Sequence, residues 1–273
     1  MQPLFIESNV RKLFAVYWPP AGKSSAEQAI VHIPAFTEEM NKSRRMAALQ
    51  ARAFAEQGYA VLVLDLFGTG DSAGDFGEAT WSIWLQDIGS AIQWLKQQGT
   101  QSIALWGLRT GALLAMDFAA NSGDAIKRLI CWQPVLNGDV FVTQFLRLRV
   151  AAAMMNSSAP QEKTSDLRKQ LLEGQFVEVA GYQLNPDLVR PILALRADQL
   201  HLQNLEDVAI FEIVLNVAVP VSASHAQWLA KLHQDGINAS LTKVVGDPFW
   251  ATQEISVAPE LIRQTCEQVK TWF

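Results

Sequence analysis

The sequence predicts an α/β fold with a doubly wound, mostly parallel sheet. Short apolar runs recur between segments of helical periodicity, and such runs are typical of strands that are covered on both faces. A turn flanked by Gly107 and Gly111 joins one of these runs to an Ala- and Leu-rich helix. The alternation stops over residues 135–204, where amphipathic helical patterns replace the strands, and then resumes. This interruption predicts a helical cap or lid inserted into the sheet.

The elements follow in order along the chain. Residues 4–18 alternate and predict an opening hairpin or edge strand. Buried strands are expected at residues 29–34, 59–65, 129–134, 208–217 and 239–245, together with the run before Gly107. Helices are expected at about 44–57, 81–97, 223–234 and 258–272 and directly after the glycine-flanked turn, with Gly58 closing the first of them. Residues 160–165 predict a loop, and no strong strand is expected between residues 135 and 204.

Composition limits the classes of function. The chain has 273 residues and a formal net charge of -5, which gives no electrostatic footprint for a nucleic acid partner. Its two cysteines, Cys131 and Cys266, have no metal-ligand spacing, so neither a metal nor a cofactor is expected. The start lacks a signal peptide, and no apolar run reaches the roughly eighteen residues that a transmembrane helix needs. We expect a cytoplasmic protein with a core at residues 1–134 and 205–273 and a cap at 135–204.

The turn between Gly107 and Gly111 has the layout of a nucleophile elbow. In such a turn a strained strand-to-helix junction exposes its middle residue above the sheet, and glycines flank it because the two backbones approach closely. In enzymes the middle residue is Ser, Cys or Asp, whereas here it is Arg109. A guanidinium stays protonated at physiological pH and cannot act as a nucleophile.

Several segments resemble known families. The loop at residues 65–72 resembles the D-x-R-G-x-G-x-S segment of the α/β-hydrolase superfamily, and its spacing to the elbow also fits. Residues 38–45, 106–109 and 246–250 resemble the exosortase A system-associated hydrolase 2 family. That resemblance implies an α/β-hydrolase fold and a place among bacterial loci for exopolysaccharide production and protein sorting. The glycines at 68, 70 and 74 are expected to form a structural turn, since the loop lacks the ending of a phosphate-binding motif.

The standard catalytic triad is missing at each of its three positions. The nucleophile position holds Arg109, and the segment after the strand at 208–217 contains no carboxylate. The histidine position after the last strand holds Asp247 and Pro248. Nearby hydroxyls and imidazoles are weak substitutes: Thr110 is expected to start a helix, and His225 beside Ser224 is expected to be a surface or packing residue. A structural role is expected for His32, and surface positions are expected for His201 and His233.

The charged residues suggest two arrangements at the elbow. Arg109 can pair with Glu38 or Glu39 and fill the former active site with an ion pair. Alternatively, Arg109 at a helix N-terminus binds a phosphate or carboxylate ligand. The candidate pocket residues are Arg109, Glu38, Glu39, Thr110, Phe36 and Trp250.

These observations predict a hydrolase-fold protein that has lost the standard triad. The leading hypothesis is an accessory protein for exopolysaccharide production or protein sorting. Its ligand would be a small anionic, acyl or saccharide molecule, or its partner another protein of that system. The alternative is an active hydrolase or acyl transferase, esterase- or thioesterase-like, that uses unconventional residues. A purely structural partner is a third option.

Overall fold

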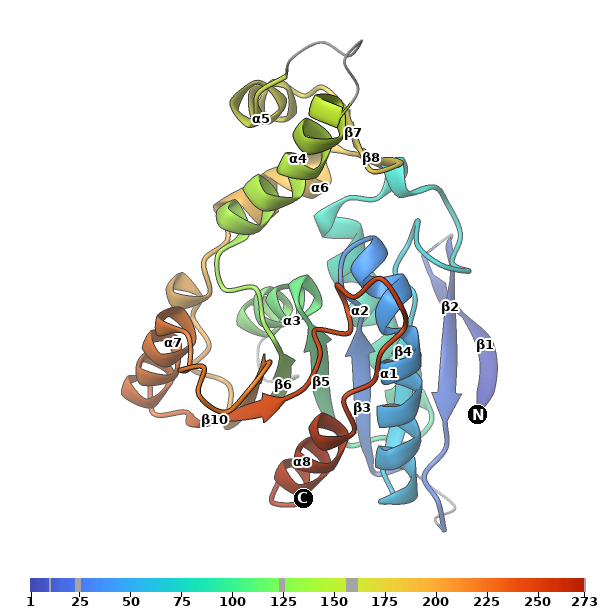
Figure 1. Cartoon of the computed structure of the whole chain (residues 1–273). Helices are drawn as coiled ribbons and strands as arrows, with labels where there is room; N and C mark the ends of the chain where they lie inside the picture. The colour runs from blue at the N-terminus through green and yellow to red at the C-terminus, as the bar shows by residue number, and fades with distance from the viewer. Residues whose placement is uncertain (10, 23–25, 123–125, 156–161, 273) are drawn as a thin grey trace.

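An eight-stranded sheet forms the centre of the molecule (Figure 1). The computed structural model describes residues 1–9, 11–22, 26–122, 126–155 and 162–272. The strand order is β1-β2-β4-β3-β5-β6-β9-β10. The strands are β1 (Gln2–Ser8), β2 (Arg11–Trp18), β3 (Gln28–Ile33), β4 (Ala60–Leu64), β5 (Ser102–Leu108), β6 (Arg128–Trp132), β9 (Asp207–Val214) and β10 (Asn238–Val245).

The pairing confirms the predicted sheet. Six strands run parallel to one another, namely β4, β3, β5, β6, β9 and β10. Strand β2 pairs antiparallel with β1 on one side and with β4 on the other. The alternating residues 4–18 therefore form the expected hairpin at the edge of the sheet, and the continuous apolar runs form its interior.

Helices cover both faces of the sheet. They are α1 (Glu38–Glu56), α2 (Trp81–Gln97), α3 (Thr110–Asn121), α7 (Ala223–Gln234) and α8 (Pro259–Val269), with a 3₁₀ turn η1 (Phe76–Glu78) before α2. Buried side chains of α1 and α8 share one core cluster with the sheet, and those of α2, α3 and α7 share the other. The two faces are thus covered by different helices, as a doubly wound sheet requires.

The elements between β6 and β9, called the insertion below, interrupt the sheet. They are α4 (Gly138–Met155), α5 (Thr164–Leu172), β7 (Val177–Val179), β8 (Tyr182–Leu184), α6 (Pro186–Ala194) and η3 (Ala197–Gln199). Figure 1 shows α4, α5, β7, β8 and α6 of the insertion at the top of the view, beyond the ends of the central strands. The small β7–β8 hairpin was not expected from the sequence, because three-residue strands carry too little periodicity to be detected.

Some element boundaries differ from the prediction. Helix α1 begins at Glu38 rather than near Arg44, and its first turn carries Glu38 and Glu39, which the positive end of the helix dipole stabilises. Gly58 closes this helix with φ 90°, as expected. Most of the loop expected at 160–165 lies outside the described residues, and α5 already begins at Thr164. Within the described residues, no helix is long and apolar enough to cross a bilayer.

Candidate functional site

Arg109 lies in the strained turn that the sequence predicts. Its backbone adopts φ 55° and ψ -117° at the junction of β5 and α3. A Cβ on Gly107 would lie 2.4 Å from the backbone of Ala112, and a Cβ on Gly111 would lie 2.3 Å from the carbonyl oxygen of Ile33. Both glycines are therefore required by the close approach of strand and helix, and the turn has the geometry of a nucleophile elbow.

A second residue has nearly the same backbone conformation. Thr37, which precedes α1, has φ 51° and ψ -126°. A non-glycine residue in this region costs on the order of 1–3 kcal/mol and persists only where the surrounding structure enforces it. The chain thus retains two strained corners, at the start of α1 and at the start of α3, although the residue at the elbow is no longer a nucleophile.

The Arg109 side chain forms an ion pair with Glu39. Its Nε donates to both carboxylate oxygens of Glu39 at 3.2 and 3.4 Å, and its Nη2 lies 3.2 Å from Oε1. The two side chains are only 20% and 22% exposed. Burial raises the pKa of the Glu39 carboxyl, and the Arg109 guanidinium acts against that rise. The nucleophile position is therefore occupied by a paired, largely buried charge.

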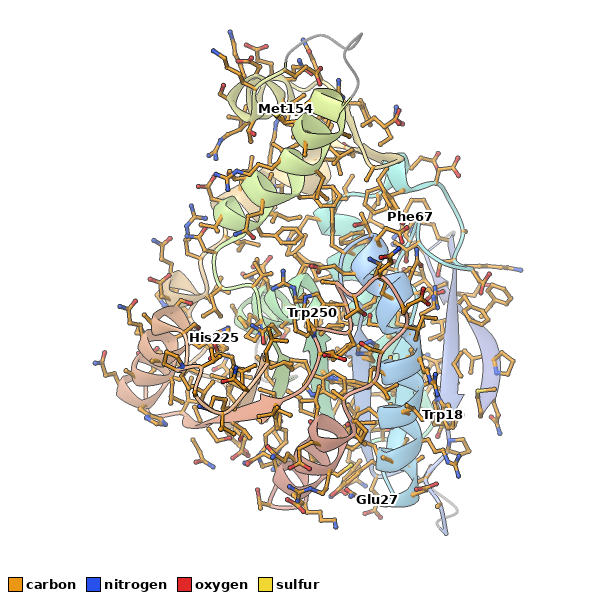
Figure 2. The ribbon with its side chains drawn as sticks, in the orientation of Figure 1. Trp18, Glu27, Phe67, Met154, His225 and Trp250 are labelled. Carbon is orange, nitrogen blue, oxygen red and sulfur yellow. The ribbon has the colours of Figure 1, made fainter. Side chains whose placement is uncertain are left out.

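One aromatic side chain contacts this ion pair, and another joins the core to α4. The Arg109 guanidinium carbon lies 5.6 Å from the centre of the Trp250 ring, within the range of a cation–π contact. Trp250, labelled in Figure 2, belongs to the loop after β10 and is 7% exposed. Phe36 packs edge-to-face against Phe141 and Phe145 of α4. Phe36 therefore joins the core to the insertion next to the elbow.

Glu38 and Thr110 are two other candidate residues of this site. Glu38 does not reach Arg109; its carboxylate accepts a hydrogen bond of 2.7 Å from the Tyr182 hydroxyl of β8. Burial, with Glu38 nearby, raises the pKa of Tyr182 to about 12. Thr110 begins α3 as expected, but its buried hydroxyl makes no hydrogen bond within the described part of the chain. Glu38 thus ties the insertion to α1, and Arg109 pairs with Glu39 alone of the two adjacent carboxylates.

The other two triad positions hold no catalytic side chain. The segment that follows β9 begins with Leu215 and Asn216, and both are exposed. Asp247 is exposed after β10, and Pro248 offers no proton-transfer group. Neither position brings a carboxylate or an imidazole to Arg109.

Ser222, His225 and Glu212 form a cluster in which the imidazole and the carboxylate are buried, and the sequence analysis did not include Glu212. Nδ1 of His225 lies 2.8 Å from Ser222 Oγ and 3.1 Å from Glu212 Oε2, and Nε2 lies 3.2 Å from the carbonyl oxygen of Pro134. A catalytic triad places the nucleophile and the carboxylate on opposite ring nitrogens, whereas here both contact Nδ1. The Glu212 carboxylate also accepts from the Ser222 backbone amide. This cluster fastens α7 to β9 and to the segment after β6.

His225 is buried, which fits the expected packing role rather than a surface position (Figure 2). The sequence does contain an indication for Glu212, because it lies inside the apolar run Val208–Val214 and a buried carboxylate must be paired. His201 and His233 are exposed, as expected.

The glycine-rich loop after β4 is a structural turn. Gly68, Gly70 and Gly74 all have positive φ, and a Cβ on Gly70 would lie 1.9 Å from the Asp65 carboxylate. That carboxylate accepts from the backbone amide of Asp71 and from Arg44. Among the described residues, no three His, Cys, Asp or Glu side chains are grouped closely enough to hold a metal ion.

A comparison of the sequence with known families also finds a match. The sequence pattern of Hydrolase_4, described as serine aminopeptidase, S33, matches residues 25–201. The chain belongs to this family. The matched range includes the elbow and Arg109.

Two curated relatives match part of the chain. Two proteins of Escherichia coli, both called "uncharacterized 31.7 kDa protein in traX-finO intergenic region", are 29% and 30% identical over 128 and 129 residues. The match covers 45% of this chain and 44% of theirs, so it spans less than half of each relative.

Among solved structures, Est1E from Butyrivibrio proteoclasticus with ferulic acid bound has a TM-score of 0.67 at 21% identity, covering 98% of this chain and 97% of that one. An α/β serine hydrolase homologue from Coxiella burnetii has a TM-score of 0.57 at 15% identity, covering 98% and 97%. At these identities the likeness shows the α/β-hydrolase fold alone.

Proposed function

We propose that this chain is a non-catalytic member of its family and works as an accessory protein that binds a ligand or a protein partner. The observation that carries the proposal is the Arg109–Glu39 ion pair at the elbow. A guanidinium that stays protonated and has two of its nitrogens on a carboxylate does not attack an acyl carbon. The absence of an acid and a histidine at the other two triad positions supports the same proposal.

The resemblance to the exosortase A system-associated hydrolase 2 family suggests the setting. We propose a cytoplasmic role in bacterial exopolysaccharide production or protein sorting, with a protein of that system as partner or with a small anionic, acyl or saccharide ligand. We also propose that residues 135–204 act as a cap on a core formed by residues 1–134 and 205–273. The contacts of Phe36 with α4 and of Glu38 with Tyr182 support this division, because they join the insertion to the elbow region.

Activity measurements test the loss of catalysis. The purified protein is incubated with a fluorophosphonate probe, short acyl esters, acyl thioesters and aminoacyl arylamides. We expect neither labelling nor turnover above that of the heat-denatured protein. Reproducible turnover that Arg109→Ala or Glu39→Ala abolishes would refute the accessory role and favour the active hydrolase or acyl transferase.

A binding measurement separates a filled elbow from an anion site. Glu39 occupies the guanidinium, so we expect phosphate and phosphorylated sugars to leave the thermal midpoint of the wild-type protein unchanged. Glu39→Ala frees Arg109, and we expect that variant to gain a phosphate-dependent rise in its midpoint. A rise in the wild-type protein that Arg109→Ala removes would show that the elbow is an anion-binding site instead.

A further inference from the structure

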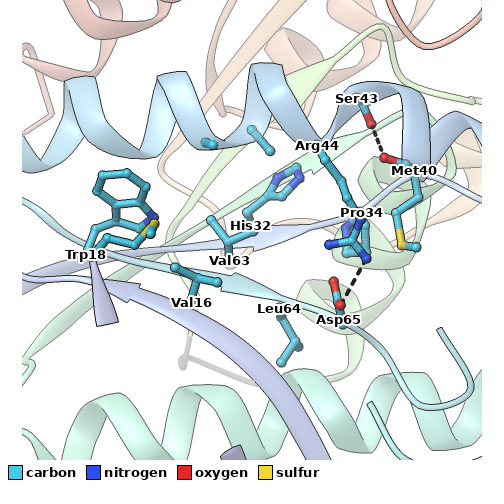
Figure 3. A pocket seen from close by; sticks show the side chains of 13 residues that line it. Val16, Trp18, His32, Pro34, Met40, Ser43, Arg44, Val63, Leu64 and Asp65 are labelled. Carbon is cyan, nitrogen blue, oxygen red and sulfur yellow. Dashed lines mark hydrogen bonds and ion pairs between the residues drawn. The ribbon is translucent and has the colours of Figure 1, made fainter. Parts of the chain in front are cut away.

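A cavity of about 200 Å³ lies away from the elbow, between α1 and the strands β2, β3 and β4 (Figure 3). Its walls are mainly apolar, and they include Val16, Trp18, Val63 and Ala47. Figure 3 shows Trp18 at one end and the Arg44–Asp65 ion pair at the other, with His32 between them. Neither Arg109 nor Glu39 lines this cavity.

His32 supplies a polar atom inside these apolar walls. The side chain comes from β3, is 3% exposed and packs against the Trp106 ring at 4.1 Å. Nδ1 lies 3.2 Å from the carbonyl oxygen of Trp106. Because a carbonyl oxygen only accepts, Nδ1 carries the proton and Nε2 presents a lone pair. Among the residues that the structure describes, none donates a hydrogen bond to Nε2.

The imidazole stays neutral at physiological pH. Burial, with a smaller contribution from the charge of Arg44, lowers the pKa of His32 to about 3, against the hydrogen bond to Trp106. Nε2 is therefore a hydrogen-bond acceptor and not a cation. A ligand that complements it carries an O–H or N–H donor rather than a carboxylate.

The remaining surroundings narrow the class of ligand. Asp65, whose side chain is 5% exposed, pairs with Arg44 at 3.0 Å, so the charge of Arg44 already faces a carboxylate. An apolar cavity of about 150 Å³ is known to admit one benzene molecule, so about 200 Å³ admits one substituted ring. Arg44 and Ala48 line the cavity and are exposed, which places part of its wall at the surface.

We propose that this cavity binds a small neutral phenol, whose hydroxyl donates to Nε2 of His32 while its ring lies against Val16, Val63 and Trp18. An aromatic ring fits apolar walls that end at an indole, and the phenol hydroxyl supplies a donor for Nε2 of His32. This site is independent of the proposed accessory role, because it uses none of the elbow residues. It also differs from the positions at which α/β-hydrolases hold a nucleophile.

Isothermal titration calorimetry with phenol and toluene tests the proposal. The two probes have the same size and differ in the hydroxyl. We expect the wild-type protein to bind phenol with a Kd of about 0.1–1 mM, as seven heavy atoms allow. We expect toluene to bind about tenfold more weakly, because it leaves Nε2 buried without a donor. Equal affinities, or no binding of phenol at millimolar concentrations, would refute the site.

Two variants locate the binding. In His32→Asn the amide nitrogen can replace Nδ1 toward Trp106 while Nε2 is removed, so we expect the preference for phenol over toluene to disappear. Ala47→Leu fills the cavity, and we expect it to abolish binding of both probes; Ala48→Leu at the exposed side replaces it if that protein does not fold. An unchanged phenol affinity in His32→Asn, or in the folded filling variant, contradicts the proposal.

Discussion

Helix α1 borders two neighbouring regions, the elbow and the cavity beside His32. The polar groups of the elbow are paired, whereas the cavity contains an acceptor that is unpaired within the described part of the chain. At the elbow, Glu39 pairs with Arg109, and Trp250 covers the guanidinium. One turn further along, Ser43 and Ala47 border a cavity in which Nε2 of His32 has no donor among the described residues. The position that hydrolases of this fold use for chemistry is filled, whereas room for a small molecule remains beside the sheet's antiparallel edge.

The difference indicates that the geometry of the elbow and the presence of the cavity do not depend on each other. The strained backbone at Arg109 occurs without a nucleophile, at a junction where Gly107 and Gly111 permit the close approach of strand and helix. The cavity does not depend on that geometry, since it lies between other side chains of α1 and the strands. Three changes test this contrast.

The largest effect is expected for Gly111→Ala, which disturbs both regions. The new Cβ would lie 2.3 Å from the carbonyl oxygen of Ile33 and 2.4 Å from that of Pro34, directly after His32 on β3. Because backbone must move, we expect the free energy of unfolding in urea to fall by more than about 4 kcal/mol. Gly89→Ala is the matched control, since the nearest atom to its Cβ is a Phe118 ring carbon at 3.9 Å. Equal losses in the two variants would show that the close approach at the elbow is unimportant.

The next effect separates the two adjacent carboxylates. Glu39→Ala leaves the largely buried Arg109 without its partner, and we expect a loss of about 2 kcal/mol in the free energy of unfolding. Glu38→Ala removes a bond to the Tyr182 hydroxyl at the surface, and we expect a loss below about 1 kcal/mol. A double-mutant cycle of Glu39→Ala with Arg109→Ala measures the pair itself. A larger loss from Glu38→Ala than from Glu39→Ala contradicts this assignment of roles.

Much of the fold was predictable because its signals are local. The glycine-flanked turn, the continuous apolar strands and Gly58 each follow from backbone sterics or burial, and the structure confirms all three. The choice between Glu38 and Glu39 was not predictable while the helix was expected to begin near Arg44. With the helix starting at Glu38, the two side chains project about 100° apart, so only one faces Arg109.

The rest of the candidate site depends on contacts between distant elements. His32 was assigned a structural role from its strand, but the free Nε2 follows from its packing against Trp106 and α1. Glu212 was not predicted because this fold is expected to carry its acid in the segment after β9, whereas Glu212 lies within β9. A void has no residue pattern of its own, since it is formed by what neighbouring side chains fail to fill.

The last change concerns the pH dependence of stability. Burial lowers the pKa of His32 to about 3, whereas an unfolded chain protonates this imidazole near pH 6.5. Between these values the unfolded state binds the extra proton, so the His32 contribution is complete above about pH 6.5 and is lost as the pH falls. We expect the difference in unfolding free energy between wild type and His32→Asn to shrink by up to about 1.4 kcal/mol per pH unit between pH 6 and 4.

Glu39, whose pKa is raised by burial, has the opposite dependence, but it is present in both proteins and its effect cancels in the difference. His233→Asn, at an exposed position, should parallel the wild type. Parallel curves for wild type and His32→Asn would mean that the imidazole is not held neutral, and the contrast between the charged elbow and the neutral cavity would then fail.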